Sequence, residues 1–231
     1  DCRFFPIENL SKTSKIIGPA VLVGSQTSIL LKRGWEGALL ESGTIKLKRV
    51  NIFLPQKHTE SAQIEVFNNL FMSIAEQMGF VLEKTAQSIT IKERLDFSCA
   101  IFDRDGELVA NAPHMPVHLG SMDSTVKSII KNNSTLSPGN LFAINAPYNG
   151  GTHLPDITIV NPIWNSKKSE IIFYTAARGH HTDIGGLTPG SMPCNSKDIH
   201  DEGIYIDNWK IVDNGIFREE EIKNKILSGP Y

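Results

Sequence analysis

The spacing of apolar residues changes near residue 90, and this change limits the folds that the chain can adopt. Over 62–88 apolar side chains recur every three or four positions, which is typical of a helix with one apolar face. From residue 97 onward the apolar runs have the length of strands and are separated by turns. Regular alternation of helix and strand, as in a doubly wound parallel sheet, is absent. The sequence therefore predicts the α+β class: a small β-rich N-terminal segment followed by a mixed helix and antiparallel-sheet domain.

The same spacing predicts individual elements of this domain. We expect a hairpin over 97–110, a second helix over about 121–133, and strands over 141–145, 157–163 and 171–176. The stripe of the first helix is expected to pack in the core, and it consists of Ile64, Phe67, Leu70, Phe71, Ile74, Met78, Val81 and Thr85.

A separate β-rich unit precedes this helix. Residues 16–50 contain short apolar runs, separated at Gly34-Trp35 and Ser42-Gly43, which favours three or four strands. The polar stretch over 55–61 is typical of a linker. We expect a β-rich unit over 1–54, a linker over 55–61 and a truncated domain over 62–231. Both ends of the sequence are abrupt, so we also expect a piece of a longer polypeptide.

Composition and charge argue against several classes of protein. With 23 basic and 25 acidic residues the net charge is −2, which gives no basic surface for nucleic acid or an anionic membrane. No apolar run approaches the roughly 18 residues that span a bilayer. Cys2, Cys99 and Cys194 are too few and too scattered for a disulfide framework or a CxxC zinc site. We expect a cytoplasmic protein that binds neither nucleic acid nor membrane.

Two glycine-rich loops contain most of the polar residues that can carry chemistry. They span 145–156 and 177–186, and each follows a predicted strand. Their glycine pairs, Gly150-Gly151 and Gly185-Gly186, allow a positive φ or a close approach of the backbone to a ligand. We expect a positive φ for at least one glycine of each pair.

The first loop contains His153 and Asp156, and His180 follows in the second loop, beside a further set, His181 and Asp183. Two imidazoles and a carboxylate can bind Zn²⁺, Mn²⁺, Fe²⁺ or Co²⁺ and leave positions for water or substrate. The alternative is an ordinary turn in which the aspartate accepts a hydrogen bond. A shared ion requires the strands joined through 164–170 to be antiparallel neighbours.

Other polar residues allow two interpretations. His118 is either a ligand or general acid/base, or a buried histidine bonded to the backbone. Arg94 and Asp96 either anchor an anionic substrate or form a structural ion pair. Cys99, in an apolar strand, is expected to behave as a small hydrophobic residue, whereas Cys194 lies in a loop without an assigned base.

Several motifs resemble the hydantoinase B/5-oxoprolinase family. The similarity runs from about 62 to 225, and its motifs lie at 67–78, 91–98, 116–122, 147–156 and 179–186. Residues 16–48, with Gly18-Pro19 and Gly34-Trp35, resemble the C-terminal end of the hydantoinase A part. This order on one chain is similar to that of fused 5-oxoprolinases, whereas hydantoinase subunits are separate chains.

The resemblance implies ATP-dependent hydrolysis of a cyclic amide, with 5-oxo-L-proline opened to L-glutamate, a reaction of glutathione metabolism. In that family the A part binds ATP with Mg²⁺ and phosphorylates the lactam carbonyl. The B part holds a divalent metal, whose ligands map to His153, Asp156 and His180; the place of His181 varies. The alternatives are an N-methylhydantoinase or ketone carboxylase subunit, or a fragment that serves only folding or dimerisation.

We assign further roles around these loops. The expected catalytic residues are His118 and Asp183, and the expected substrate-binding residues are Arg94, Asn149, Gly150 and Gly151. Many family members have an acidic residue where Ala146 stands, so no ligand or base is expected there. The expected partners are a small-molecule substrate, 5-oxoproline or a hydantoin, the remainder of the A and B parts, and further copies in a homo-oligomer.

The chain of 231 residues alone is expected not to hydrolyse ATP, because it contains neither a GxxxxGK[ST] nor a GxGxxG phosphate loop and the family's ATP site belongs to the A part. Phosphate release by the purified chain should equal that of a heat-treated control. Turnover above the control would contradict this expectation.

Overall fold

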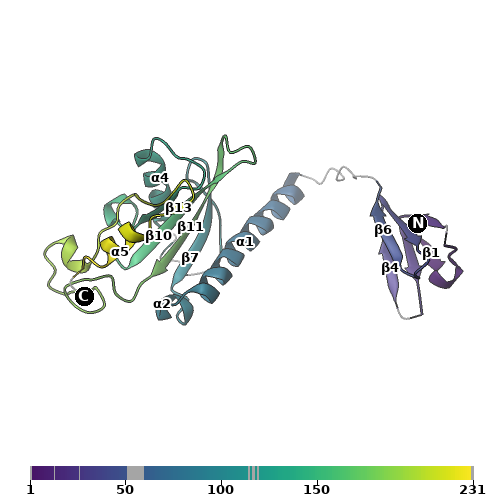
Figure 1. Cartoon of the computed structure of the whole chain (residues 1–231), viewed down its shortest axis with the longest axis horizontal. Helices are drawn as coiled ribbons and strands as arrows, with labels where there is room; N and C mark the ends of the chain where they lie inside the picture. The colour runs from purple at the N-terminus through teal and green to yellow at the C-terminus, as the bar shows by residue number, and fades with distance from the viewer. Residues whose placement is uncertain are drawn as a thin grey trace. The chain divides into compact units, whose positions relative to one another are not determined.

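The computed structural model describes residues 2–12, 14–25, 27–50, 60–113, 115, 118 and 120–229. The chain divides into two units, Asp1–Gln63 and Ile64–Tyr231 (Figure 1). Both units contain β-sheet, helices accompany the sheet of the second, and the predicted α+β class is confirmed. A search of the described helices for one long and apolar enough to cross a membrane finds none.

The N-terminal unit contains two three-stranded sheets with the orders β1-β3-β4 and β2-β5-β6. Their cores share the buried residues Ile16, Ala20, Leu22 and Leu31. A short 3-10 helix, η1 (Ile7–Asn9), follows the first strand. The strands are β1 (Arg3–Pro6), β2 (Lys15–Ile17), β3 (Ala20–Val23), β4 (Ser28–Leu31), β5 (Trp35–Leu39) and β6 (Ile45–Arg49).

The prediction of three or four strands in this unit is wrong. The apolar run over 16–23 divides at Gly18-Pro19, so its two halves belong to different sheets. Trp35, expected to mark a boundary between strands, begins β5, because Gly34 makes the turn with a φ of 84°. β1 is held by parallel pairing with β3, a tertiary contact that apolar spacing does not reveal.

An antiparallel seven-stranded sheet forms the second unit, with the order β13-β12-β9-β10-β11-β7-β8 in the described residues. The predicted neighbours β10 and β11 are adjacent and antiparallel. The strands are β7 (Phe97–Asp103), β8 (Leu108–Asn111), β9 (Leu141–Ile144), β10 (Asp156–Trp164), β11 (Ile171–His180), β12 (Trp209–Asp213) and β13 (Ile216–Phe217).

The predicted second helix is α4 (Met122–Asn132), and it covers one face of this sheet (Figure 1). Its buried residues Met122, Val126 and Ile129 belong to the largest core cluster, together with Phe142 and Val160 of the sheet. Because alternate residues of a strand share a face, Tyr174 and Ala176 also lie in this cluster, and residues 178 and 180 continue the same face toward the end of β11.

The opposite face contacts α1 (Glu60–Thr85) and α2 (Ile89–Lys92). Met78 and Leu82 pack on a cluster formed by Ile91, Phe97 and Cys99, and burial raises the pKa of the Cys99 thiol to about 12, as suits a small hydrophobic residue. Near the middle of α1, the rings of Phe71 and Phe173 meet edge to face with centroids 5.1 Å apart.

The helix predicted over 62–88 is present, but the prediction that its whole stripe is core is wrong. The buried residues of α1 are Ala75 and Gly79, on a line rotated about the helix axis from the stripe. The exposed members of the stripe are Ile64, Phe67, Leu70, Ile74, Val81 and Thr85. Most of the predicted linker lies outside the described residues, and its last two residues, Glu60 and Ser61, begin α1.

The predicted hairpin is confirmed, with one carboxylate oxygen of Asp103 accepting the amide hydrogens of Asp105 (2.9 Å) and Glu107 (2.8 Å). By contrast, β12, β13 and the charged helix α5 (Glu219–Ile226) are not predicted from the sequence. β13 and β12 lie at the edge of the sheet, where Ile216 and Phe217 remain exposed, and no residue of α5 is buried, so these elements carry little periodic apolar signal.

Candidate metal centre

Two paired strands bring the predicted metal-binding residues to one end of the sheet. Asp156 is the first residue of β10, His180 is the last of β11, and the two are partners in the register. Both therefore project from the face that α4 covers, beyond Val160 and Ala176. His153 lies three residues before Asp156, in the loop that leads into β10.

His153, Asp156 and His180 form a cluster whose ligand atoms all lie within 4.8 Å of one another. Nδ1 of His180 is 2.9 Å from Oδ1 of Asp156, and Nδ1 of His153 is 3.1 Å from Oδ2. The two imidazoles are stacked, with ring centroids 5.1 Å apart. The predicted convergence of these side chains is confirmed as geometry, and metal binding by them stays a prediction.

Asp156 is a buried carboxylate with 2% of its surface exposed. Burial by itself would raise its pKa, but hydrogen bonds from His153, Thr152 and His180 outweigh burial and lower the pKa. The hydrogen bond to Asp156 raises the pKa of His153, against the effect of burial. The cluster thus combines a buried negative charge with two imidazoles, which suits a cation.

His118 extends this cluster toward the start of α4. Its side chain is buried, and Nε2 lies 3.5 Å from Oδ2 of Asp156 and 3.5 Å from Oδ1 of Asp96. Nδ1 has no hydrogen-bond partner in the described part of the chain. Burial lowers the pKa of His118, while Asp156 and Asp96 act in the opposite direction. The alternative of an imidazole bonded to the backbone is therefore wrong.

Asp96 contacts His118 of the cluster, whereas the sequence suggests that it anchors an anionic substrate or pairs with Arg94. Its backbone oxygen accepts the amide hydrogen of His180 (2.9 Å), because β7 pairs with β11. Arg94 is exposed, and no ion pair of its side chain occurs among the described residues. The expected pair is therefore wrong, and Asp96 becomes visible only when the strands are paired.

The glycines of the two loops behave as predicted, since φ is 91° at Gly150 and 84° at Gly185. Their surroundings differ from a ligand cradle. A Cβ on Gly150 would lie 2.2 Å from the backbone nitrogen of Thr125, and one on Gly151 would lie 2.3 Å from the carbonyl oxygen of Asn145. These two glycines let the loop pack tightly against α4 and the end of β9.

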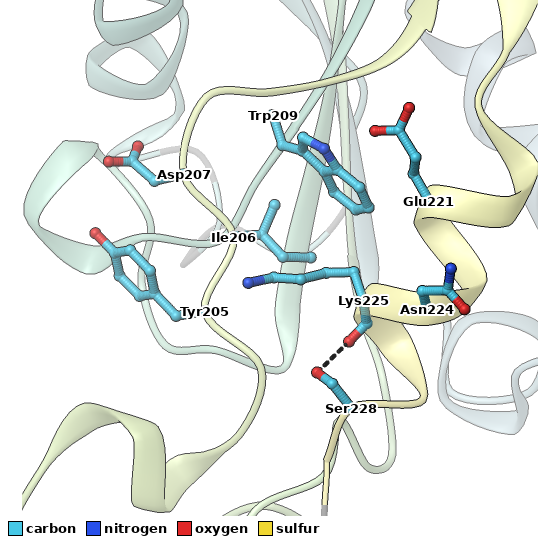
Figure 2. A pocket seen from close by; sticks show the side chains of 8 residues that line it. All are labelled: Tyr205, Ile206, Asp207, Trp209, Glu221, Asn224, Lys225 and Ser228. Carbon is cyan, nitrogen blue, oxygen red and sulfur yellow. Dashed lines mark hydrogen bonds between the residues drawn. The ribbon is translucent and has the colours of Figure 1, made fainter.

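Asn149 lies at the edge of a surface pocket. Its side-chain amide donates a hydrogen bond to Asp207 (2.8 Å), and Asp207 lines a pocket of about 570 Å³ beside α5. Figure 2 shows this lining, in which Trp209 and Lys225 face the same space as Tyr205. The histidine–aspartate cluster is not part of the lining in the described residues, and the side-chain hydrogen bond given for Asn149 is to Asp207 rather than to the cluster.

Asp183 stabilises its own loop, in contrast to its predicted catalytic role. Its carboxylate accepts hydrogen bonds from the amides of Gly185 (2.8 Å) and Gly190 (2.9 Å) and from the hydroxyl of Ser191 (2.8 Å). These bonds lower the pKa of Asp183. No hydrogen bond or ion pair joins it to the cluster among the residues that the structure describes. Sequence spacing gave no means of distinguishing this loop aspartate from a site residue.

His180 rather than His181 joins the cluster, as preferred from the sequence. Side chains alternate along an extended strand, so His181 turns to the other face, where it lines an apolar pocket with Ile157 and Ile206. Burial lowers the pKa of His181, with a smaller contribution in the same direction from His180. These neighbouring histidines therefore occupy opposite sides of the sheet.

Comparison with known proteins gives a consistent result. A family model described as Hydantoinase B/oxoprolinase matches residues 60–230. 5-oxoprolinase 1 of Arabidopsis thaliana is 43% identical over 235 residues, covering 100% of this chain and 18% of that protein. The 5-oxoprolinase of Saccharomyces cerevisiae is 44% identical over 237 residues, with the same two coverages. The crystal structure of the ATP-dependent caprolactamase from Pseudomonas jessenii superposes with a TM-score of 0.66 at 25% identity, covering 76% of this chain and 30% of that one.

The chain belongs to the hydantoinase B/oxoprolinase family. Within that family it is similar along its whole length to proteins named 5-oxoprolinase, and it spans about a fifth (18%) of their length.

Replacing Gly150 by alanine should destabilise the second unit strongly. Gly215→Ala is the matched control, because Gly215 has a φ of 82° but nothing within 4 Å of an added Cβ. We expect the control to lower the free energy of unfolding by about 1 kcal/mol through its positive φ alone. Gly150→Ala should cost about 3 kcal/mol, since the loop backbone must also move away from α4. Equal losses in urea unfolding would contradict the tight packing.

Asp183→Ala should loosen its loop without affecting the cluster. We expect the amides of Gly185 and Gly190 to exchange hydrogen at least about fivefold faster, because each loses a bond to a carboxylate. Mn²⁺ binding should stay unchanged. In the unsubstituted protein, the folded loop lowers the pKa of Asp183. The protection of these two amides from exchange should therefore be present at neutral pH and disappear as the pH falls through that lowered pKa. Loss of Mn²⁺ binding in this variant would show that Asp183 contributes to the metal centre.

Proposed function

We propose that this chain provides the divalent metal centre of an ATP-dependent cyclic-amide hydrolase that opens 5-oxo-L-proline to L-glutamate. The observation that carries the proposal is the convergence of His153, Asp156 and His180 at one end of the sheet. The choice of 5-oxoproline is supported by the relatives named 5-oxoprolinase, which align along the whole chain, including the residues before the family match begins at 60.

We further propose that residues 1–54 are the C-terminal end of a hydantoinase A-type part, and that the B-type domain begins near residue 62. ATP with Mg²⁺ would then be bound by the A-type part of the complete protein. The same proposal places the reaction in glutathione metabolism and in the cytoplasm, and includes the remaining A and B parts and further copies of the protein as partners.

The donor set fits a divalent transition-metal ion. Two imidazoles and a carboxylate are ligands that Zn²⁺, Mn²⁺, Fe²⁺ and Co²⁺ share. Ligand atoms about 2.1 Å from one ion lie roughly 3–4 Å apart, so donors within 4.8 Å of one another need only small side-chain rotations. The buried Nδ1 of His118, unpartnered among the described residues, is a further polar atom that the protein itself does not satisfy.

A bound ion of this kind polarises a carbonyl group and lowers the pKa of water. The surrounding side chains would keep the charge and protons in place. Asp156 stays anionic and orients both imidazoles through its two oxygens. His118, whose Nε2 faces two carboxylates, is suited to hold a proton at that atom. The side chain of Asp96 is 26% exposed and could pass this proton to solvent.

A cyclic amide with a different ring is the second candidate substrate, because a solved structure with the same fold is an ATP-dependent caprolactamase at 25% identity. The complete protein should release ADP in the presence of 5-oxoproline, and more slowly with caprolactam or a hydantoin at the same concentration. Faster turnover of caprolactam or a hydantoin would make that amide, rather than 5-oxoproline, the favoured substrate. If none of these amides stimulates ADP release, both candidates are wrong.

His153→Ala should remove the metal, with His181→Ala as the matched control. His181 lies on the opposite face of the sheet, so its loss should leave the metal content unchanged. We expect the complete His153→Ala protein to bind Mn²⁺ at least about 100-fold more weakly, because it lacks one of three protein ligands. Titration with Mn²⁺ measures this affinity, and elemental analysis of the purified proteins measures the metal content. Equal metal content in all three proteins would make His153 a structural residue.

A further inference from the structure

A buried arginine lies between the candidate metal centre and the main core. Arg178 in β11 is the register partner of Thr158 in β10, on the same face as Asp156 and His180, and none of its surface is exposed. Burial lowers its pKa to about 10, an effect that Asp156 opposes, so the guanidinium is cationic at neutral pH.

The hydrogen-bonding capacity of this guanidinium is fully used. A guanidinium has five N–H donors in a rigid planar fork. All five have acceptors here, and each acceptor is a hydroxyl or carbonyl oxygen rather than a carboxylate. Nε donates to Oγ1 of Thr158 (2.7 Å), Nη1 to the carbonyl of His118 (3.0 Å) and Oγ of Ser121 (2.8 Å), and Nη2 to Oγ1 of Thr125 (2.8 Å) and the carbonyl of Gly150 (2.9 Å).

These acceptors belong to three segments that each carry part of the site. Thr158 follows Asp156 by two residues in β10, and Gly150 precedes His153 by three in the loop. His118 contributes its carbonyl to Arg178 and its Nε2 to Asp156. Thr125 strengthens the junction, because its hydroxyl also donates to the carbonyl of Gly150.

The buried cation affects both the stability and the geometry of this region. Removing one member of a buried hydrogen-bonded set leaves its partners unsatisfied and lowers stability. Here the side chain joins β10, the segment at the start of α4 and the glycine-rich loop at one point. An apolar residue of similar volume would leave these oxygens without donors and the three segments without a common partner.

We propose that Arg178 is a positioning residue of the metal centre, holding His118 and the loop of His153 at the spacing at which their side chains reach Asp156. This inference rests on the proposed metal-binding function of the cluster. The inference predicts the direction in which metal affinity changes when Arg178 is removed. A cation beside a divalent ion repels it, so an arginine that acted only through its charge would weaken metal binding, and its removal would strengthen binding. If Arg178 positions the ligands, its removal should instead weaken metal binding.

The test compares Mn²⁺ affinity, measured by titration calorimetry, in the complete protein and in its Arg178→Lys and Arg178→Met variants. We expect at least about a tenfold loss of affinity in both. Lysine retains the charge, but its three donors on one nitrogen cannot bond to acceptors in three segments. Arg104→Met, in the exposed turn between β7 and β8, is the control and should bind Mn²⁺ normally. Thermal unfolding with the metal chelated reports the fold of each variant.

A rescue experiment separates positioning from stability. Methylguanidinium, but not methylammonium, should restore part of the Mn²⁺ affinity of Arg178→Ala, since only the planar cation presents the donor fork. If methylguanidinium restores folding but not Mn²⁺ affinity, Arg178 contributes to stability alone. This conclusion also holds if the variants are unfolded in the absence of metal.

Unchanged or tighter Mn²⁺ binding by folded Arg178→Lys and Arg178→Met would overturn the inference and leave the proposed function intact. If the unsubstituted protein binds no Mn²⁺, or His153→Ala binds it equally well, the proposed function fails and this inference fails with it.

Discussion

The arrangement of the site depends on the register between β10 and β11. Asp156 and His180 are paired across these strands, so the carboxylate and the imidazole meet on one face of the sheet. A slip of one residue would send the two side chains to opposite faces. The register is held by the core, because the same alternation places Val160 and Ala176 beneath α4. Packing far from the polar residues thus determines their geometry.

Two buried charges of opposite sign lie on this face, and neither is paired directly with the other. Asp156 is satisfied by hydrogen bonds from Thr152, His153 and His180, while Arg178 is satisfied by neutral oxygens. Each charge affects its neighbours through the low dielectric of the interior. The hydrogen bond to Asp156 raises the pKa of His153, Asp156 opposes the lowering of the Arg178 pKa by burial, and Arg178 acts to lower the pKa of His118. This face therefore carries both a buried negative and a buried positive charge in the protein alone.

The two faces of the sheet differ in chemical character. At the end where β10 begins, the loop before it, the start of α4 and the end of β11 converge on a polar cluster. On the opposite face, His181 and the neighbouring isoleucines line apolar surface beside α1 and α5. Several apolar residues of α1 are exposed, and they explain why an amphipathic pattern overestimates burial: it identifies an apolar helix face but not what covers it.

Local pattern by itself determined α1, α4, the hairpin at residue 103 and the three central strands, because periodicity and turn chemistry act over a few neighbouring residues. It also selected His153, Asp156 and His180, since their residue types and loop positions can be read from the sequence. Only the tertiary structure decided the edge elements, whose short runs carry little apolar signal, and the roles of the other polar residues. Asp183 and Asp96 are both aspartates beside strand ends, yet one holds its own loop and the other faces His118. Arg178 gives no sequence signal at all, because an arginine in a strand is ordinarily exposed and its burial depends on three distant segments that supply oxygens to one guanidinium.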